Sequence, residues 1–223
     1  MAIDLEPLLL TIRVSLITTP VLFLFCIPLA FWLTRAPPAL RYPVQALVNL
    51  PLALPPTVIG FYLLVCFSPE GFLGHYLKSW FHLSIPFTQT GLVIGSVFFS
   101  LPFMVNPILS GFESLPPVLS EEAQMLGASK WQTLFHVLLP DIKPSLLAAG
   151  VLTFAHTMGE FGVALMIGGK IPGKTLMASM VVYDEVESLN FGAAHVYSLI
   201  LLGLSFTALL ALFIINRKWY RDM

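Results

Sequence analysis

The chain has 223 residues, of which 57% are hydrophobic and only 10% are charged, whereas an average soluble domain is about 25% charged. Because charged side chains normally cover the surface of a soluble protein, this composition, with a mean hydropathy of +0.87, excludes a soluble domain and predicts an integral membrane protein. The net charge of −1 argues against nucleic-acid binding, which needs a clustered basic surface.

The N-terminal segment 1–6 is acidic and lacks the basic start of a secretory signal, so the apolar run after it is expected to stay as a membrane anchor. The two cysteines, Cys26 and Cys66, both lie in apolar runs. They are interpreted as small buried hydrophobic residues rather than as a disulfide.

Five stretches are long and apolar enough to cross a bilayer as helices. The stretches are 14–34, 42–69, 79–112 (with the span starting near Thr90), 144–169 and 188–216 (with the span starting near His195). The segment 70–86 is too short for a sixth span and contains Lys78. The sequence therefore predicts one all-α transmembrane domain, residues 1–223, with five membrane helices.

The distribution of Lys and Arg predicts the orientation, because these residues gather in cytoplasmic loops. With the N-terminus outside and the C-terminus inside, seven Lys and Arg residues fall on the inner side and four on the outer side. The inner ones are Arg35, Arg41, Lys130, Lys143, Arg217, Lys218 and Arg221, and the outer ones are Arg13, Lys78, Lys170 and Lys174.

Proline interrupts several predicted spans, and each proline removes a backbone donor and clashes with the preceding turn. The densest cluster is the segment 49–56 of the second span, with prolines at 51, 55 and 56. It predicts a broken helix that faces protein or a pathway, where the freed carbonyl groups find partners. Simple kinks that help the helices to pack are the alternative.

The longest inner segment, 110–143, has the pattern of two short helices joined at a glycine. Ser120 before Glu121 and Glu122 is expected to start the first helix, and Gly127 allows a turn. The spacing from Ser129 to Gln132 is that of a capping box, and Pro140 is expected to end the second helix. The segment 110–143 has more apolar side chains than a surface loop needs, so some should cover the spans and others should contact a partner.

This segment resembles the cytoplasmic "EAA" loop of ABC-importer permeases. The stretch from Glu121 to Gly127, followed by Val137-Leu138-Leu139-Pro140, matches Glu-Ala-Ala, three residues, Gly, nine residues and Ile-x-Leu-Pro. Glu122 replaces the first Ala and Val137 replaces Ile. The resemblance implies that this loop couples the chain to an ATPase, through Glu121, Glu122, Ala123, Gly127, Leu139 and Pro140.

Other segments look like the molybdate permeases of that family: 50–60 in the second span, 159–162 in the fourth, and 169–175 just after it. Sulfate permeases share a similar Glu-(Phe/Tyr)-Gly variant. The resemblance implies a multi-pass homodimer in the cytoplasmic (inner) membrane of a prokaryote. It also implies two separate ATPase subunits, which bind the ATP and Mg, and an extracytoplasmic protein that captures a tetrahedral oxyanion. Molybdate or tungstate is the expected substrate, with sulfate or thiosulfate as the alternative.

The segment 168–175 also fits G-x-x-x-x-G-K-T, the phosphate-binding loop of NTPases. That motif needs a strand before it and a helix after it, whereas here a membrane span precedes it, and Pro172 removes one backbone N–H. It is therefore interpreted as a turn leaving the membrane, and this chain is expected to bind no cofactor of its own.

Glu160 is the one carboxylate inside a predicted span, and such a group should face protein or water rather than lipid. His156 and Thr153 precede it on the same helical face, so His156 and Glu160 could share a hydrogen bond or a proton. A structural or gating role is favoured for Glu160, with proton coupling and direct binding of substrate as alternatives. Phe161 is included among the gating candidates.

No nucleophile–base constellation and no metal-ligand spacing appears, so the chain is expected not to be an enzyme and to hold no metal. The predicted mechanism is alternating access driven by the partner ATPase. A secondary transporter driven by an ion gradient is a rival, although such proteins often show two comparable halves. A membrane-embedded enzyme would have only His156 and Glu160 available for chemistry.

Overall fold

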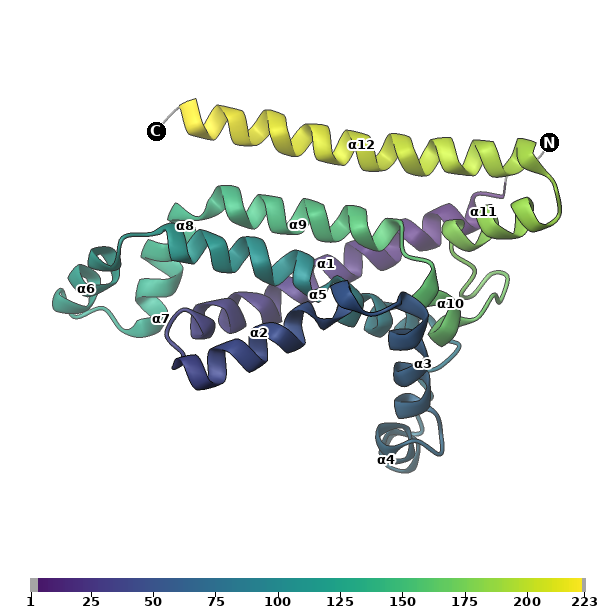
Figure 1. Ribbon diagram of the computed structural model, residues 1–223, viewed down its shortest axis with the longest axis horizontal. Helices are drawn as coiled ribbons and strands as arrows, with labels where there is room; N and C mark the ends of the chain where they lie inside the picture. The colour runs from purple at the N-terminus through teal and green to yellow at the C-terminus, as the bar shows by residue number, and fades with distance from the viewer. Residues whose placement is uncertain (1–3, 222–223) are drawn as a thin grey trace.

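The computed structural model describes the backbone of residues 4–221 and the side chains of residues 4–216, and within that range every regular element is helical. Figure 1 shows an elongated bundle with α6 and α7 at one end and α10 and α11 at the other. Helix α12 runs along the bundle and finishes at the end that carries α6. The predicted all-α membrane fold is confirmed.

Three helices are each long and apolar enough to cross a membrane. They are α1 (Glu6–Leu33), α5 (Gln89–Ser114) and α12 (Phe191–Arg221). Two bent pairs of helices pass the same test only when each pair is taken together, so the described residues hold three to five spans. The pairs are Pro38–Ala53 with Pro56–Phe67, and Lys130–Asp141 with Lys143–Met158, which is bent by 79°. The first helix begins at Glu6 rather than at Val14. The count of five and the orientation stay predictions.

The second predicted span is broken, as the proline cluster indicates. Helices α2 (Pro38–Ala53) and α3 (Pro56–Phe67) meet at 113°. Leu54 and Pro55, between them, have extended ψ angles of 146° and 135°, because a residue before proline avoids the helical region. Other prolines stay inside continuous helices, at 20 and 28 in α1 and at 102 and 107 in α5. Helices α3 and α4 (Phe72–Phe81) lead away from the bundle (Figure 1).

The fourth predicted span, 144–169, is wrong as a single helix. Helix α9 (Lys143–Met158) ends before Gly159, and a short helix, α10 (Gly162–Gly168), starts after Phe161. Two glycines within four residues weaken helix propagation, and the Gly159 N–H group turns back to the Ala155 and His156 carbonyls. The fourth segment is thus a second broken helix.

The two short half-helices that follow the breaks, α3 and α10, pack on one another. A Cβ atom added to Gly60 of α3 would lie 2.7 Å from the Met166 Cβ and 3.0 Å from the Val163 Cα. A Cβ atom on Gly162 of α10 would lie 2.8 Å from the Pro56 Cβ. Glycine at both positions therefore permits a contact of backbone on backbone, which brings the two breaks together.

Helices α1, α5 and α9 form the centre of the bundle, and one apolar cluster fills the half nearest α6. Two side chains of the inner segment, Leu134 and Leu138, are buried in this cluster. At the opposite end, α11 (Ala178–Glu187) is tied to α1 by a hydrogen bond of 2.9 Å from the Ala178 N–H to the Thr11 hydroxyl. The inner segment is therefore attached directly to the membrane helices.

The glycine contact between α3 and α10 predicts that Gly60→Ala destabilises the chain by about 1–3 kcal/mol, because the new methyl group must displace backbone. Thermal unfolding of the purified chain measures the change. Gly203→Ala in α12 is the matched control, since its Cβ atom would meet nothing within 4 Å. An equal effect of both substitutions would contradict the packing described here.

Candidate functional site

The inner segment forms a helical hairpin that begins with α6 (Pro117–Met125) and turns at Gly127. Gly127 has a φ of +86°, and the Ala128 N–H group donates to the Ala123 carbonyl over 3.0 Å, which closes the end of α6 as a Schellman motif. The capping box at Ser129 and Gln132 is confirmed by hydrogen bonds in both directions. It is followed by α7 (Lys130–Thr133), the π-helix η1 (Leu134–Leu138) and α8 (Leu139–Asp141).

Two details of the predicted hairpin are wrong. Ser120 does not cap the first helix, because α6 begins earlier, at Pro117, and the Ser120 hydroxyl donates to the Pro117 carbonyl. Proline is favoured in a first helical turn, where no partner for its missing N–H is needed. Pro140 likewise does not end the second helix, since it occupies the first turn of α8 after the π-helical stretch.

An apolar surface lies at the tip of this hairpin and is called the coupling tip below. The exposed fraction is 86% for Met125 and 89% for Leu126, and Trp131 and Phe135 are also exposed, with their rings 6.1 Å apart. Large apolar side chains this exposed at the end of a helical bundle are typical of a surface that docks a partner. The coupling tip is thus a candidate protein interface.

The six residues predicted to couple the chain to an ATPase fall into two groups. Glu121 and Glu122 are exposed on α6, and Gly127 forms the turn, so these three lie at or beside the coupling tip. Ala123 is 8% exposed and packs inward, while Leu139 and Pro140 are half-buried where the hairpin meets the bundle. The first group can contact a partner and the second attaches the hairpin.

A second candidate site lies where the two broken helices meet. A cavity of about 510 Å³ is lined by residues of α3, α5, α9 and the break after α9. The lining residues include Pro56, Thr57, Phe99, His156, Glu160 and Phe161. Broken helices are tolerated at membrane depth where they border a cavity or are buried in protein.

Glu160 lies in the break itself and is 2% exposed. Its backbone carbonyl accepts a hydrogen bond of 2.5 Å from the Ser179 hydroxyl of α11. Both of its carboxylate oxygens, and the hydroxyls of Ser96 and Thr153, are buried and have no hydrogen-bond partner among the described residues. A buried carboxyl without a partner is costly, which makes Glu160 unusual among the buried side chains of the described residues.

The predicted pairing of His156 with Glu160 is wrong. Because α9 ends at Met158, Glu160 does not continue the helical face that carries His156. His156 turns to α5 instead, where its Nδ1 atom lies 3.0 Å from the Ser100 hydroxyl and its ring stacks on Phe103 at 3.9 Å. Phe161 contacts Tyr183 of α11, with ring centroids 5.1 Å apart.

The segment 168–175 forms a turn between α10 and α11, as predicted. Gly169 and Gly173 have φ angles of +65° and +71°, and the Thr175 hydroxyl donates to the Gly168 carbonyl over 2.7 Å. Thr175, which would hold Mg in a phosphate-binding loop, is therefore buried and used within the turn. No strand precedes the loop in the described part of the chain.

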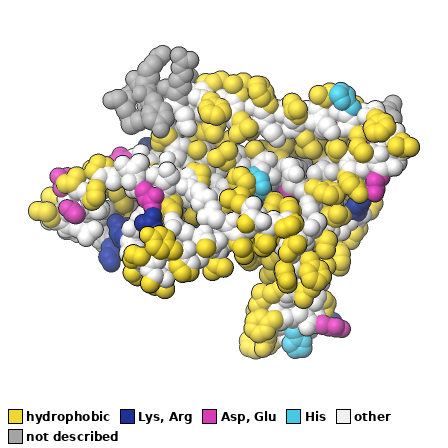
Figure 2. All heavy atoms as spheres, viewed as in Figure 1, with side chains coloured by type: hydrophobic (Ala, Val, Ile, Leu, Met, Phe, Trp, Pro, Cys, Tyr) yellow, Lys and Arg dark blue, Asp and Glu magenta, His cyan; other side chains and the backbone are white. Residues whose placement is uncertain are grey.

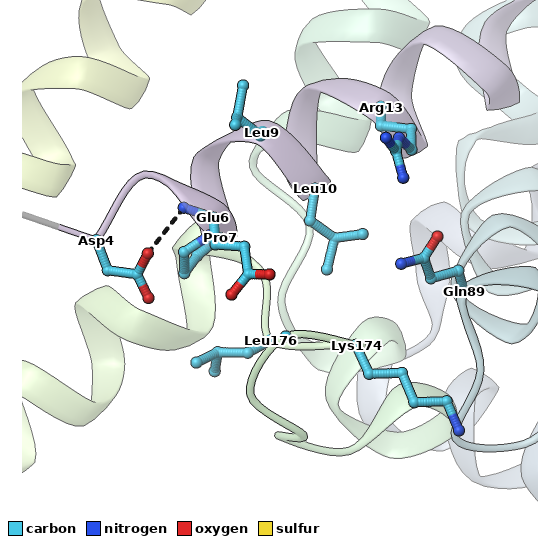
Figure 3. A pocket seen from close by; sticks show the side chains of 10 residues that line it. Asp4, Glu6, Pro7, Leu9, Leu10, Arg13, Gln89, Lys174 and Leu176 are labelled. Atoms are coloured by element: carbon cyan, nitrogen blue, oxygen red, sulfur yellow. Dashed lines mark hydrogen bonds between the residues drawn. The ribbon is translucent and has the colours of Figure 1, made fainter.

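This turn forms one wall of a polar pocket of about 200 Å³ at the N-terminal end of α1. In Figure 3, Arg13, Gln89 and Lys174 lie on one side of the pocket and Asp4 and Glu6 lie on the other. The pocket is at the opposite end of the bundle from the coupling tip (Figure 1).

Sequence reasoning missed the polar residues near the breaks, namely Ser96, Ser100, Thr57 and Ser179. Single hydroxyl groups in apolar segments carry no distinctive signal, because Ser and Thr also bond to their own helix. Three of them lie on elements far from Glu160 in sequence, so only the tertiary fold places them near the break.

Comparison with known proteins agrees with these features. Residues 26–220 match the family model described as binding-protein-dependent transport system inner membrane component. The chain is 42% identical over 210 residues to the molybdenum transport system permease protein ModB of Azotobacter vinelandii, covering 94% of this chain and 93% of that protein. It is 35% identical over 192 residues to the sulfate transport system permease protein CysT of Escherichia coli, covering 86% and 68%.

A solved bacterial alginate ABC transporter, in complex with a periplasmic protein bound to an alginate pentasaccharide, shares the fold. The TM-score is 0.72 at 19% identity, over 96% of this chain and 79% of that one. With a family model that covers most of its length and with these relatives, the chain belongs to the family of binding-protein-dependent inner-membrane transport components and is a multi-pass permease subunit of an ABC importer.

Proposed function

We propose that this permease imports a tetrahedral oxyanion, molybdate or tungstate, as a homodimer that works with two ATPase subunits and an extracytoplasmic binding protein. The relative at 42% identity is a molybdenum permease and matches over nearly the full length of both chains. The segments 50–60 and 159–162, which resemble the molybdate version of the family, are the ones that form the two breaks and the cavity between them.

The observation that carries the proposal is the coupling tip. Its exposed apolar side chains, beside two exposed carboxylates on α6, form a surface that a water-facing loop would not keep without a partner. The ATPase subunits bind the ATP and Mg, and this chain transmits their movement. The hairpin is attached to the bundle through Leu134 and Leu138, so a displacement of the tip moves the membrane helices.

The transport step is alternating access, with the cavity at the broken helices as part of the pathway. The cavity opens at the edge of a single chain, and a second copy related by a two-fold axis would enclose a central pathway. No Lys or Arg lines the cavity, so anion selectivity lies with the extracytoplasmic protein. Glu160 acts as a gating residue whose carboxyl is buried in the conformation described here and meets water or a donor in the other one.

Sulfate or thiosulfate is the second candidate substrate, because the sulfate permease from Escherichia coli is 35% identical. A secondary transporter driven by an ion gradient is disfavoured, since the family depends on binding proteins. An enzymatic role is disfavoured as well, because His156 and Glu160, the one reactive pair available, do not contact each other.

Gly127→Val is expected to uncouple the chain from its ATPase. A β-branched residue is strained at a φ of +86° by about 1–3 kcal/mol, so the turn rearranges and displaces the coupling tip. Co-purification of the ATPase with the tagged permease should fall by roughly tenfold or more. Gly127→Asn is the matched control, because Asn tolerates the left-handed region, and no Cβ contact opposes it. Normal co-purification of the Val variant would contradict this role.

Glu160→Gln is expected to leave assembly with the ATPase intact while abolishing the stimulation of ATP hydrolysis by anion-loaded binding protein. The amide fits the same buried space, but it cannot ionise when the gate opens. The control is Glu70→Gln, at an exposed carboxylate between α3 and α4. Wild-type transport by Glu160→Gln would remove this residue from the mechanism.

The substrate proposal predicts that molybdate and tungstate stimulate ATP hydrolysis at concentrations at least about tenfold lower than sulfate, a difference of about 1.4 kcal/mol or more in binding. The measurement uses the purified permease dimer with its ATPase and its binding protein in lipid. Equal or better stimulation by sulfate would transfer the assignment to the sulfate permeases.

A further inference from the structure

The His156 side chain, in the cavity at the broken helices, is held in one orientation by α5. Its ring stacks on Phe103, with ring centroids 3.9 Å apart, and contacts Phe99, with centroids 4.9 Å apart. The Nδ1 atom lies 3.0 Å from the Ser100 hydroxyl. These three residues lie on one side of the helix, so α5 fixes both the plane of the ring and the direction of Nδ1.

The other ring nitrogen of His156 is accessible. The Nε2 atom has no hydrogen-bond partner in the described part of the chain, and it is not one of the enclosed polar atoms that lack a partner there, so it keeps accessible surface. His156 lines the cavity of about 510 Å³. In Figure 2, the middle of the face in view is mostly apolar and carries a histidine, whereas Lys and Arg side chains lie toward its two ends.

Two buried hydroxyl groups decide which nitrogen of the His156 ring carries a hydrogen. The Ser100 hydroxyl lies 3.0 Å from the His156 Nδ1 atom and 3.0 Å from the Thr157 hydroxyl, and neither hydroxyl has another partner among the described residues. Both serine and threonine are fully buried. Every proton finds an acceptor in one arrangement only, in which Thr157 donates to Ser100 and Ser100 donates to Nδ1. A hydrogen on Nδ1 would leave one hydroxyl proton without an acceptor.

The Nδ1 atom of His156 therefore accepts a hydrogen bond, and the hydrogen of the neutral ring is on Nε2. The ring thus presents one N–H donor at the cavity, where its partner must be an acceptor. The Thr57 hydroxyl of α3 lines the same cavity and can supply a second donor. Among the described residues, Glu160 is the other titratable one in the lining.

We propose that His156 is a substrate-binding residue, whose Nε2–H group donates a hydrogen bond to the tetrahedral oxyanion as the anion crosses the cavity. Ser100 is a positioning residue, because its hydroxyl holds the hydrogen of the ring on Nε2. The inference rests on the proposed function, which supplies both the anion and the pathway. A hydrogen bond to an anion is stronger than one between neutral groups. A neutral donor beside the Glu160 carboxyl still gives a contact weak enough to release the solute, as a pathway requires.

The first test measures the uptake of radiolabelled molybdate by proteoliposomes that contain the permease, its ATPase and its binding protein. His156→Phe keeps an aromatic ring beside Phe103 and removes the donor, so uptake per ATP hydrolysed should fall by about tenfold. His156→Gln places an amide N–H group near the Nε2 position and should keep about half of the wild-type uptake or more. His195→Phe, at an exposed histidine of α12, is the matched control and should leave uptake unchanged.

The second test needs no transport. In nanodiscs that hold the permease and its ATPase, with ¹⁵N-labelled histidine, the signals of His156 are identified by their loss in His156→Gln. Wild type should carry the hydrogen on Nε2, because protonated and unprotonated ring nitrogens have separate ¹⁵N shifts. Ser100→Ala removes the donor to Nδ1 and should give a mixture of both tautomers. It should also lower uptake by about twofold, which keeps the transport test decisive if His156→Phe does not assemble.

Wild-type uptake by His156→Phe would overturn this role of His156, and so would a loss of uptake that His156→Gln does not restore. A wild-type ring with its hydrogen on Nδ1 would overturn it as well. If wild-type vesicles take up neither molybdate nor tungstate nor sulfate, the proposed function fails instead. Normal wild-type uptake with no effect of the His156 variants counts against this inference alone.

Discussion

Every backbone polar group at membrane depth must find a partner within the protein, and this constraint determines where the chain can be broken. The two breaks, at Leu54-Pro55 and at Gly159–Phe161, lie side by side because α3 and α10 pack through Gly60 and Gly162. The cavity described above is lined by residues of both breaks, so it lies beside this contact.

The break after α9 determines what surrounds the Glu160 side chain. In a continuous helix its side chain would project beside His156, and the two could pair. In the broken helix, the Glu160 backbone carbonyl accepts a hydrogen bond from the Ser179 hydroxyl. The Glu160 carboxyl is buried and has no hydrogen-bond partner among the described residues. A buried carboxyl without a partner is costly, and this cost is the reason for the gating role proposed for Glu160.

Much of the fold followed from local chemistry in the sequence. The capping box at Ser129, the glycine turn at Gly127 and the proline break at Leu54 each depend on a few adjacent residues, and each was predicted. The end of α9 before Gly159 also has a local cause, the glycines at 159 and 162, which the apolar run 144–169 concealed. The partner of His156 is different in kind, because Ser100 lies 56 residues away. Contacts between distant segments leave no periodic signal in a single sequence.

Helix α9 connects the two candidate sites. It begins one residue after α8, at the foot of the hairpin, and ends at the break that holds Glu160. Its 16 residues span about 24 Å as a straight helix, and its flanks pack against α1 and α5. Helix α9 therefore joins the hairpin, which meets it at a bend of 79°, to the glycine-containing break. In the proposed mechanism, α9 is the element that carries a displacement of the coupling tip to the cavity at the broken helices.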